Sequence, residues 1–264
     1  MGYSAKGVLE SPFGQALSFL TPFGGAVTPR PNALNCFPLV GALLGLVLGG
    51  LWLATDHLWP EQVAAAIVVL ADVVLTGMLH LDGLADSADG LLGPLSKERR
   101  LEVMRDPRSG AFGVTAVGIT LLLRWVSLSV LAPSIWLMVG IWSVSRTAMA
   151  LVAIAAPYAR EAEGGLASVF IREPGGGSEG NGPPRFARAK RLLMVGVPGG
   201  IVGVVAVIVW NPVAGPVCLV AGVVCALALL SFSLRRIGGY TGDVLGAIGV
   251  IVETVSLLVA AARW

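Results

Sequence analysis

Residues 38–55, PLVGALLGLVLGGLWLAT, form an uninterrupted apolar stretch without a charged residue. An apolar helix of about 20 residues spans the ~30 Å hydrocarbon core of a bilayer. Further apolar stretches follow at 61–81, 111–131, 135–157, 192–210, 215–233 and 244–262. The sequence therefore predicts an all-α, polytopic integral membrane protein with about seven transmembrane helices.

The composition of the 264-residue chain agrees with this prediction. Hydrophobic residues make up 55% of the chain and charged residues only 13%, about half the roughly 25% of soluble domains. These values exclude a disordered chain, a disulfide scaffold and an ordinary soluble enzyme. The net charge of +2 is too small for a nucleic-acid partner. We expect one membrane-embedded catalytic domain over residues 1–264, with the lipid bilayer as its partner and 173–184 as a flexible low-complexity loop. The sequence leaves open whether the chain forms a homo-oligomer.

The Lys and Arg residues are distributed unevenly over the connections between the apolar stretches. Fifteen of the 18 lie in four segments, whereas the short connections 56–60, 132–134 and 211–214 contain none. The positive-inside rule assigns basic loops to the cytoplasm. We therefore expect a multi-pass protein of the cytoplasmic (inner) membrane, with its N-terminus and its longer loops in the cytoplasm and its C-terminus outside. The four basic segments are 1–35, 82–110, 158–191 and 234–243.

Glycines recur within the apolar stretches at a spacing near four residues. Gly41, Gly45 and Gly49 form one such series, and Gly196 and Gly200 form another. Small residues at this spacing let two helices approach closely in a membrane. The two series therefore predict tight helix packing at both places.

The most informative motif is HLDGLADSADG, residues 80–90, at the expected cytoplasmic end of the second apolar stretch. In a helix, Asp82, Asp86 and Asp89 occupy positions i, i+4 and i+7 and share one face. The residues between them are Gly, Leu, Ala and Ser, so the acidic stripe is narrow. We interpret it as a divalent cation site rather than a solvated acidic face. Carboxylate ligands with a single nearby histidine, His80, favour Mg²⁺, or Mn²⁺ as the alternative, over zinc.

A basic segment, SKERRLEVMRDPRSGAFG (96–113), follows the acidic motif. Arg105 and Arg108 surround Asp106 near a Pro and a Gly, and guanidinium groups bind phosphate oxygens in pairs. Carboxylates for a metal followed by arginines for phosphate suit phosphoryl transfer. The sequence contains no P-loop of the G-x-x-x-x-G-K-[ST] type, which speaks against a P-loop ATPase. Three further basic residues are interpreted as marking the inner membrane face: Lys97, Arg99 and Arg100.

Four ionisable residues lie inside the apolar stretches, where an unpaired charge costs at least a few kcal/mol. For Asp72 and Arg124 we favour a structural ion pair or snorkelling, whereas Arg146 and Glu253 are open between structure and function. Near the last stretch, Asp243 in GGYTGDVLGA (238–247) is either a helix N-cap or a ligand.

These motifs resemble the membrane cobalamin synthases, formally adenosylcobinamide-GDP ribazoletransferases. The similar pieces occur in the order of the family and cover nearly the whole chain. The H-L-D-G-L-A-D-x-x-D-G core and the T-G-D-V-L-G-A ending are the most specific. The pieces are LSFLT (17–21), FPLVGALLG (37–45), TGMLHLDGLADSADGLLG (76–93), RRLEVMRDPRSGAFG (99–113), SRTAM (145–149), APYAREAEGGLAS (156–168) and GGYTGDVLGA (238–247).

The resemblance implies an enzyme that joins adenosylcobinamide-GDP to α-ribazole, or to its 5′-phosphate, and releases GMP. It implies metal and diphosphate binding by Asp82, Asp86 and Asp89, with either Asp86 or Asp89 accepting the hydroxyl proton and His80 as an orienting or proton-handling neighbour. Phosphate handling is implied for six further residues: Arg105, Asp106, Arg108, Arg146, Arg160 and Asp243.

Two alternatives are weighed against this function. A CDP-alcohol phosphotransferase also uses an aspartate-rich motif, but its pattern has an Arg after the Ala. In this chain Ala85 is followed by Asp86 instead. A transporter of ions or cofactors would place its polar groups near the middle of the membrane. The acidic motif lies at the membrane edge, which favours a catalyst for phosphorylated substrates.

Overall fold

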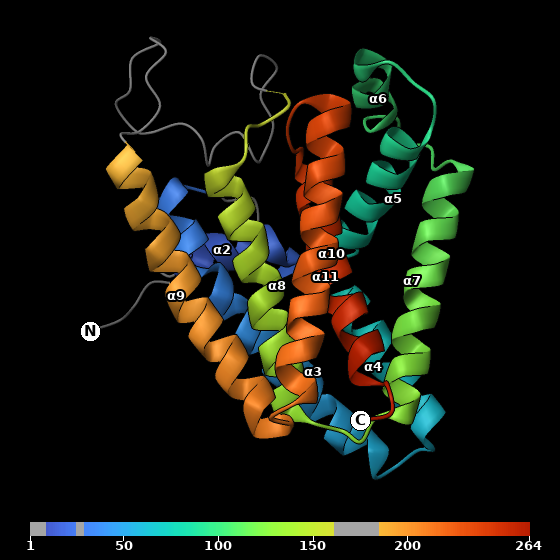
Figure 1. Cartoon of the computed structure of the whole chain (residues 1–264). Coiled ribbons are helices and arrows are strands. Elements are labelled where there is room, and N and C mark those ends of the chain that lie inside the picture. Colours follow the sequence, from blue (N-terminus) through green and yellow to red (C-terminus); the bar gives the residue numbers. More distant parts are fainter. Residues whose placement is uncertain (1–8, 25–28, 161–184) are drawn as a thin grey trace.

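The computed structural model describes residues 9–24, 29–160 and 185–264. These residues are helical throughout, apart from turns and one isolated β-bridge between Tyr158 and Tyr240. Figure 1 shows the helices as a bundle. They are α2 (Pro12–Leu20), η1 (Pro22–Gly24), η2 (Pro31–Cys36), α3 (Phe37–Asp56), α4 (Glu61–Leu75), α5 (Leu79–Leu92), α6 (Lys97–Val103), α7 (Ala111–Val130), α8 (Ile135–Ala155), α9 (Arg185–Trp210), α10 (Ala214–Ile237) and α11 (Gly242–Ala260).

Within the described residues, six helices are long and apolar enough to span a membrane. They are α3 together with η2, and α7, α8, α9, α10 and α11. They confirm six of the seven predicted stretches. The connections α3–α4, α7–α8 and α9–α10 lie at one end of the bundle, and α6 with the start of α7 lies at the other (Figure 1). The loops therefore sort to opposite ends as the alternation of charge predicts, and the end that carries α6 is called the charged end below.

The apolar stretch 61–81 is not one continuous helix. It breaks between α4 and α5, and the chain bends by 86° at this break. Gly77 and Met78 at the break have φ values of +59° and +62°, a left-handed conformation that no right-handed helix can continue through. The Pro22 ring packs against Gly77, where an added Cβ would lie 3.1 Å from it. The bend is therefore in contact with η1, more than fifty residues earlier.

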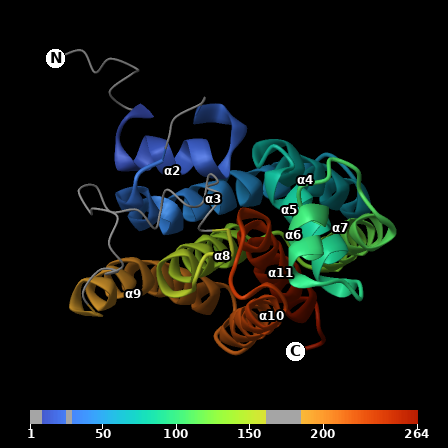
Figure 2. The ribbon, with the colours of Figure 1, turned by 90° about the horizontal axis from the view of Figure 1, so that it is seen from above.

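Two helices form the interior of the bundle. Most of α8 and α11 is buried, whereas α7, α9 and α10 present most of their surface outward. Seen from above, α11 lies between α5, α8 and α10 (Figure 2). The apolar residues of the outer helices face the surroundings because a bilayer, unlike water, accepts them there.

Close packing through glycine is confirmed for one predicted series and wrong for the other. A Cβ on Gly41, Gly45 or Gly49 would collide with the backbone of α8, so α3 lies directly on that helix. On α9, Gly196 has only ordinary contacts and Gly200 has open space around it. The residues of α9 that touch neighbouring elements closely are Gly199 and Gly203, three residues further along each time.

Candidate active site

The helix α5 places its three aspartates on one face, as their spacing predicts. The apolar and small residues between them are buried, whereas Asp82 is exposed and Asp86 and Asp89 are partly exposed. The apolar run that includes α4 ends at Leu81, and the acidic face follows it. The side-chain carboxylates of Asp82 and Asp86 accept no hydrogen bond from the part of the chain that the structure describes.

The start of α11 brings a fourth carboxylate to this face. A Cβ on Gly83 would lie 2.7 Å from the carbonyl oxygen of Asp243, so the two helices touch at this point. Asp243 is not the N-cap of α11, which corrects that alternative: Thr241 is the cap, and its Oγ1 accepts the Val244 N–H at 3.3 Å. The side chain of Asp243, in the first turn, accepts from the Thr241 hydroxyl at 3.1 Å. We call Asp82, Asp86 and Asp243 the carboxylate cluster.

Among the described residues, one arginine from another part of the chain contacts the carboxylate cluster. The Arg160 Nη2 lies 3.4 Å from Asp243 Oδ2. The chain before Arg160 is held by two backbone hydrogen bonds of 2.9 Å, from Ala159 N–H to the Tyr240 carbonyl and from Tyr240 N–H to the Pro157 carbonyl. This bridge joins the segments that follow α8 and precede α11. It therefore carries two of the predicted phosphate-handling residues, Arg160 and Asp243, to the acidic helix.

The electrostatics of the cluster are dominated by its excess of negative charge. Partial burial, followed by the carboxylates of Asp243, Asp82 and Asp89, raises the pKa of Asp86 to about 7, and Arg160 acts in the opposite direction. An ordinary Asp has a pKa near 4. Asp86 is therefore half protonated near neutral pH unless a cation joins the cluster.

Asp89 differs from the other two aspartates of its face because its carboxylate is already engaged. Its Oδ2 accepts the Gly110 N–H at 2.7 Å, and its Oδ1 accepts the Gly113 N–H at 2.9 Å. Both donors belong to the start of α7. Asp89 thus connects α5 to the start of α7.

The arginine loop between α6 and α7 is exposed at the charged end. Arg108 binds Asp106 through Nε–Oδ1 at 2.9 Å and Nη2–Oδ2 at 2.6 Å. These hydrogen bonds hold the pKa of Asp106 down to about 2. The Arg108 side chain is 86% exposed, and Arg105 is also exposed.

The structure does not join His80 and Arg146 to the carboxylate cluster by any described contact. His80 lies on the buried side of α5, where a Cβ on Gly246 of α11 would be 3.3 Å from its Cα. Arg146 is fully buried in α8 and pairs with Glu253 and with the Ser145 hydroxyl. His80 Nε2 and two guanidinium nitrogens of Arg146 have no partner among the described residues. Their roles in phosphate or proton handling stay predictions.

The remaining intramembrane charges form what we call the ion network: Asp72, Arg124, Arg146 and Glu253. Arg124 binds Asp72 at 2.5 Å and Glu253 at 2.6 Å, which confirms the predicted ion pair. The indole N–H of Trp142 donates to Asp72 at 3.0 Å. The network links α4, α7, α8 and α11 below the site, and its two acids match its two arginines.

Arg100 is a structural residue whose role the sequence analysis missed. Its side chain is 2% exposed and donates to the carbonyls of Gly90, Leu91 and Gly93 at 2.6–2.9 Å. These carbonyls end α5, so Arg100 caps the acidic helix rather than marking the membrane face. The position of Met104 one turn later, also buried, is the signal that could have indicated an inward face of α6.

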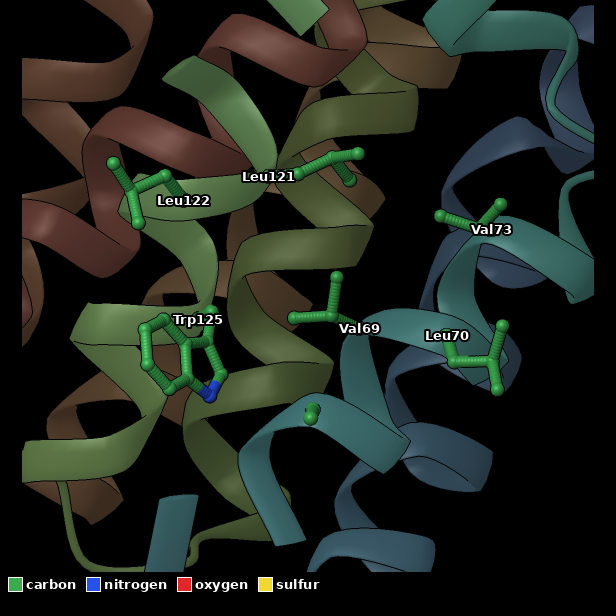
Figure 3. A pocket seen from close by; sticks show the side chains of 7 residues that line it. Val69, Leu70, Val73, Leu121, Leu122 and Trp125 are labelled. Carbon is green, nitrogen blue, oxygen red and sulfur yellow. The ribbon is translucent and has the colours of Figure 1, made fainter. Parts of the chain in front are cut away.

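An apolar groove of about 530 Å³ lies between α4 and α7 (Figure 3). Its lining is entirely apolar except for the Trp125 indole N–H, which donates to the Gln62 carbonyl at 2.9 Å. It offers no group that binds phosphate. Its lining residues are Ala66, Val69, Leu70, Val73, Leu121, Leu122 and Trp125.

Among the described residues, no three His, Cys, Asp or Glu side chains form a ready metal cluster. Mg²⁺ commonly binds proteins through one or two carboxylates and takes its other ligands from substrate phosphates and water. The donor set of the carboxylate cluster, carboxylate oxygens with an excess of negative charge, fits such an ion.

Comparison with known proteins gives one consistent result. A family model described as cobalamin-5-phosphate synthase matches residues 12–261. A protein of Syntrophobacter fumaroxidans named adenosylcobinamide-GDP ribazoletransferase is 39% identical, over 96% of this chain and 99% of its own. Relatives of the same name from Chlorobaculum parvum and Shewanella amazonensis are 37% and 35% identical, over 87% and 88% of this chain and 85% of each relative. No solved structure matches.

Proposed function

The chain belongs to the cobalamin-5-phosphate synthase family, and we propose that it joins adenosylcobinamide-GDP to α-ribazole, or to its 5′-phosphate, at the charged end of the bundle. The 3′-hydroxyl of the ribazole attacks the phosphorus on the cobinamide side of the diphosphate, the bond from that phosphorus to the oxygen bridging it to GMP breaks, and GMP leaves. The observation that carries the proposal is the convergence of Asp82, Asp86 and Asp243 with Arg160 on one short helix face.

The diphosphate needs cations because both it and the carboxylates are negative. We propose that Asp82 and Asp86, the two α5 aspartates that accept no hydrogen bond within the described chain, hold Mg²⁺ or Mn²⁺. When bound, the ion neutralises charge on the diphosphate and on the departing GMP. Arg160, Arg105 and Arg108 supply further positive charge from two sides of the acidic helix.

The attacking hydroxyl must lose its proton to a base within hydrogen-bond reach. Of the two aspartates that the sequence leaves open for this role, Asp89 already accepts two N–H groups. Such bonds favour the charged form and weaken a base. A divalent ion on Asp86 has the same effect on that carboxylate, so the choice between the two aspartates stays a prediction.

We further propose that the charged end faces the cytoplasm of the inner membrane. The loops of that end carry most of the Lys and Arg residues, which supports the orientation. A reporter enzyme active only outside the cytoplasm, fused after Trp264, should be active. The same fusion placed after Asp106 should be inactive, and the reverse result would overturn the orientation.

The reaction itself is tested with the purified protein in detergent. With both substrates and MgCl₂ we expect GMP and a corrinoid product in equal amounts by chromatography, and no product after chelation of divalent ions. If no GMP forms while ions or cobamides accumulate in proteoliposomes, the chain is a transporter and the proposal is wrong.

A further inference from the structure

The first turn of α7 receives its cap from a distant part of the chain. The first N–H groups of a helix have no partner within it and are usually satisfied by the side chain of the N-cap residue. The N-cap of α7 is Gly110, which has no side chain to offer. The Asp89 carboxylate from α5 takes this role, at 2.7 Å from the Gly110 nitrogen and 2.9 Å from the Gly113 nitrogen.

The contact is closely fitted on both sides. A Cβ on Gly110 would lie 2.6 Å from Asp89 Oδ1, and a Cβ on Gly113 would collide with Oδ2. Only residues without a side chain therefore allow the carboxylate to reach both nitrogens. The negative charge also lies at the positive end of the α7 dipole, which is its favourable position.

The arginine loop is tied to α5 at both of its ends. On one side, Arg100 of α6 binds the terminal carbonyls of α5. On the other side, Asp89 holds Gly110, two residues after Arg108. The position of Arg105 and Arg108 relative to Asp82 and Asp86 is thus set by two contacts to the helix that carries the acids.

We infer that Asp89 is a positioning residue that fixes the arginine loop for the diphosphate of adenosylcobinamide-GDP, and that it is not a ligand of the divalent ion. The inference rests on the proposed function. The three predicted aspartates thus have two different roles. Asp82 and Asp86 face the ligand, whereas Asp89 binds the backbone at the start of α7.

The first test is Asp89→Asn, which keeps one acceptor oxygen and removes the charge. We expect the KM for adenosylcobinamide-GDP to rise about tenfold, because a displaced loop misplaces its arginines, with kcat within about threefold of the wild type. Mn²⁺ binding without substrate, followed by electron paramagnetic resonance, should stay within about twofold, since no ligand is lost. Asp82→Asn should lose that binding.

The second test leaves every carboxylate in place. Gly110→Ala pushes the Asp89 side chain away and should repeat the rise in KM with unchanged Mn²⁺ binding. Gly118→Ala is the matched control in the same helix, since a Cβ there meets nothing within 4 Å, and it should behave as the wild type.

A loss of Mn²⁺ affinity in Asp89→Asn as large as that in Asp82→Asn would overturn the inference. An unchanged KM in both Asp89→Asn and Gly110→Ala would also overturn it. If the wild type forms no GMP, the proposed function fails instead, and the Mn²⁺ measurement still decides whether Asp89 is a ligand.

Discussion

The ion network and the carboxylate cluster use the same residue types but treat charge in opposite ways. In the network, Arg124 contacts both Asp72 and Glu253 within 2.6 Å, and Arg146 pairs with Glu253. In the cluster, the closest contact between opposite charges is 3.4 Å, from Arg160 to Asp243, and Asp82 has no described partner.

The difference follows from the surroundings of each group. An unpaired charge in hydrocarbon is too costly to keep, so the buried acids are matched by arginines. At the charged end, water and ions can compensate an excess of carboxylates, and that excess is available for a ligand. The proposed site therefore rests on the excess of acid at the charged end, rather than on the buried charges.

The largest effect is expected from Asp82→Asn, which removes an unpaired acid of the cluster. Turnover should fall by about a thousandfold or more, because a carboxylate proposed to hold the divalent ion is lost. The thermal midpoint should stay unchanged, since the Asp82 side chain accepts no hydrogen bond from the described residues. Asp56→Asn, at the opposite end of the bundle, is the matched control. Retained turnover in Asp82→Asn would remove the metal assignment.

Breaking the network should affect stability instead. Arg124→Leu leaves Asp72 buried without its arginine and leaves Glu253 with Arg146 alone, at a cost of about 3–5 kcal/mol. After heating, the peak of folded Arg124→Leu protein in size-exclusion chromatography should be much smaller than that of the wild type. Arg99→Leu breaks an exposed pair with Glu102 and should change stability by less than about 1 kcal/mol. Equal effects of the two variants would contradict the distinction between paired and unpaired regions.

Gly83→Ala tests whether the cluster depends on the contact between α5 and α11. The added Cβ would lie 2.7 Å from the Asp243 carbonyl oxygen, so the helices must separate. We expect turnover to fall by about ten- to a hundredfold, as Asp243 and Arg160 move away from Asp86. Gly50→Ala, with open space around its Cβ, should have wild-type turnover. A wild-type rate for both would show that the contact is dispensable.

The smallest effect concerns pH. The pKa of Asp86 is raised to about 7, so below pH 7 this carboxyl is mostly neutral and a cation must displace its proton. Mn²⁺ affinity should therefore rise by up to about tenfold per pH unit below 7 and level off above it. Asp86→Asn should flatten this dependence. A wild-type affinity that is constant between pH 6 and 8 would show that Asp86 is not a ligand.

Much of the fold could be predicted from the sequence because hydropathy is a local property. The six long helices and the separation of basic from neutral loops follow from runs of about 20 apolar residues. The break at Gly77 could not be predicted in the same way, because the sign of φ leaves no trace in an apolar run and Pro22 is far away in the chain. The register error on α9 has the same origin, since both Gly196 and Gly199 fit a helix.

The acidic face of α5 was also predictable, since its spacing of four and three residues matches the helical period. Which of these acids have hydrogen-bond partners could not be predicted from the spacing. Asp89 is engaged by glycines more than twenty residues later, and Arg160 and Asp243 meet through the bridge at Tyr158 and Tyr240. Such pairings depend on where helix ends meet in space.

Composition and helical period suffice to predict that this chain spans a membrane, that its charges gather toward one end and that an acidic motif lies there, because each of these features is local in the chain. The pairing of the charges follows from the fold instead, since it requires contact between segments far apart in the chain. Among the described residues, Asp72 and Glu253 are neutralised by such contacts, whereas the side chains of Asp82 and Asp86 accept no hydrogen bond.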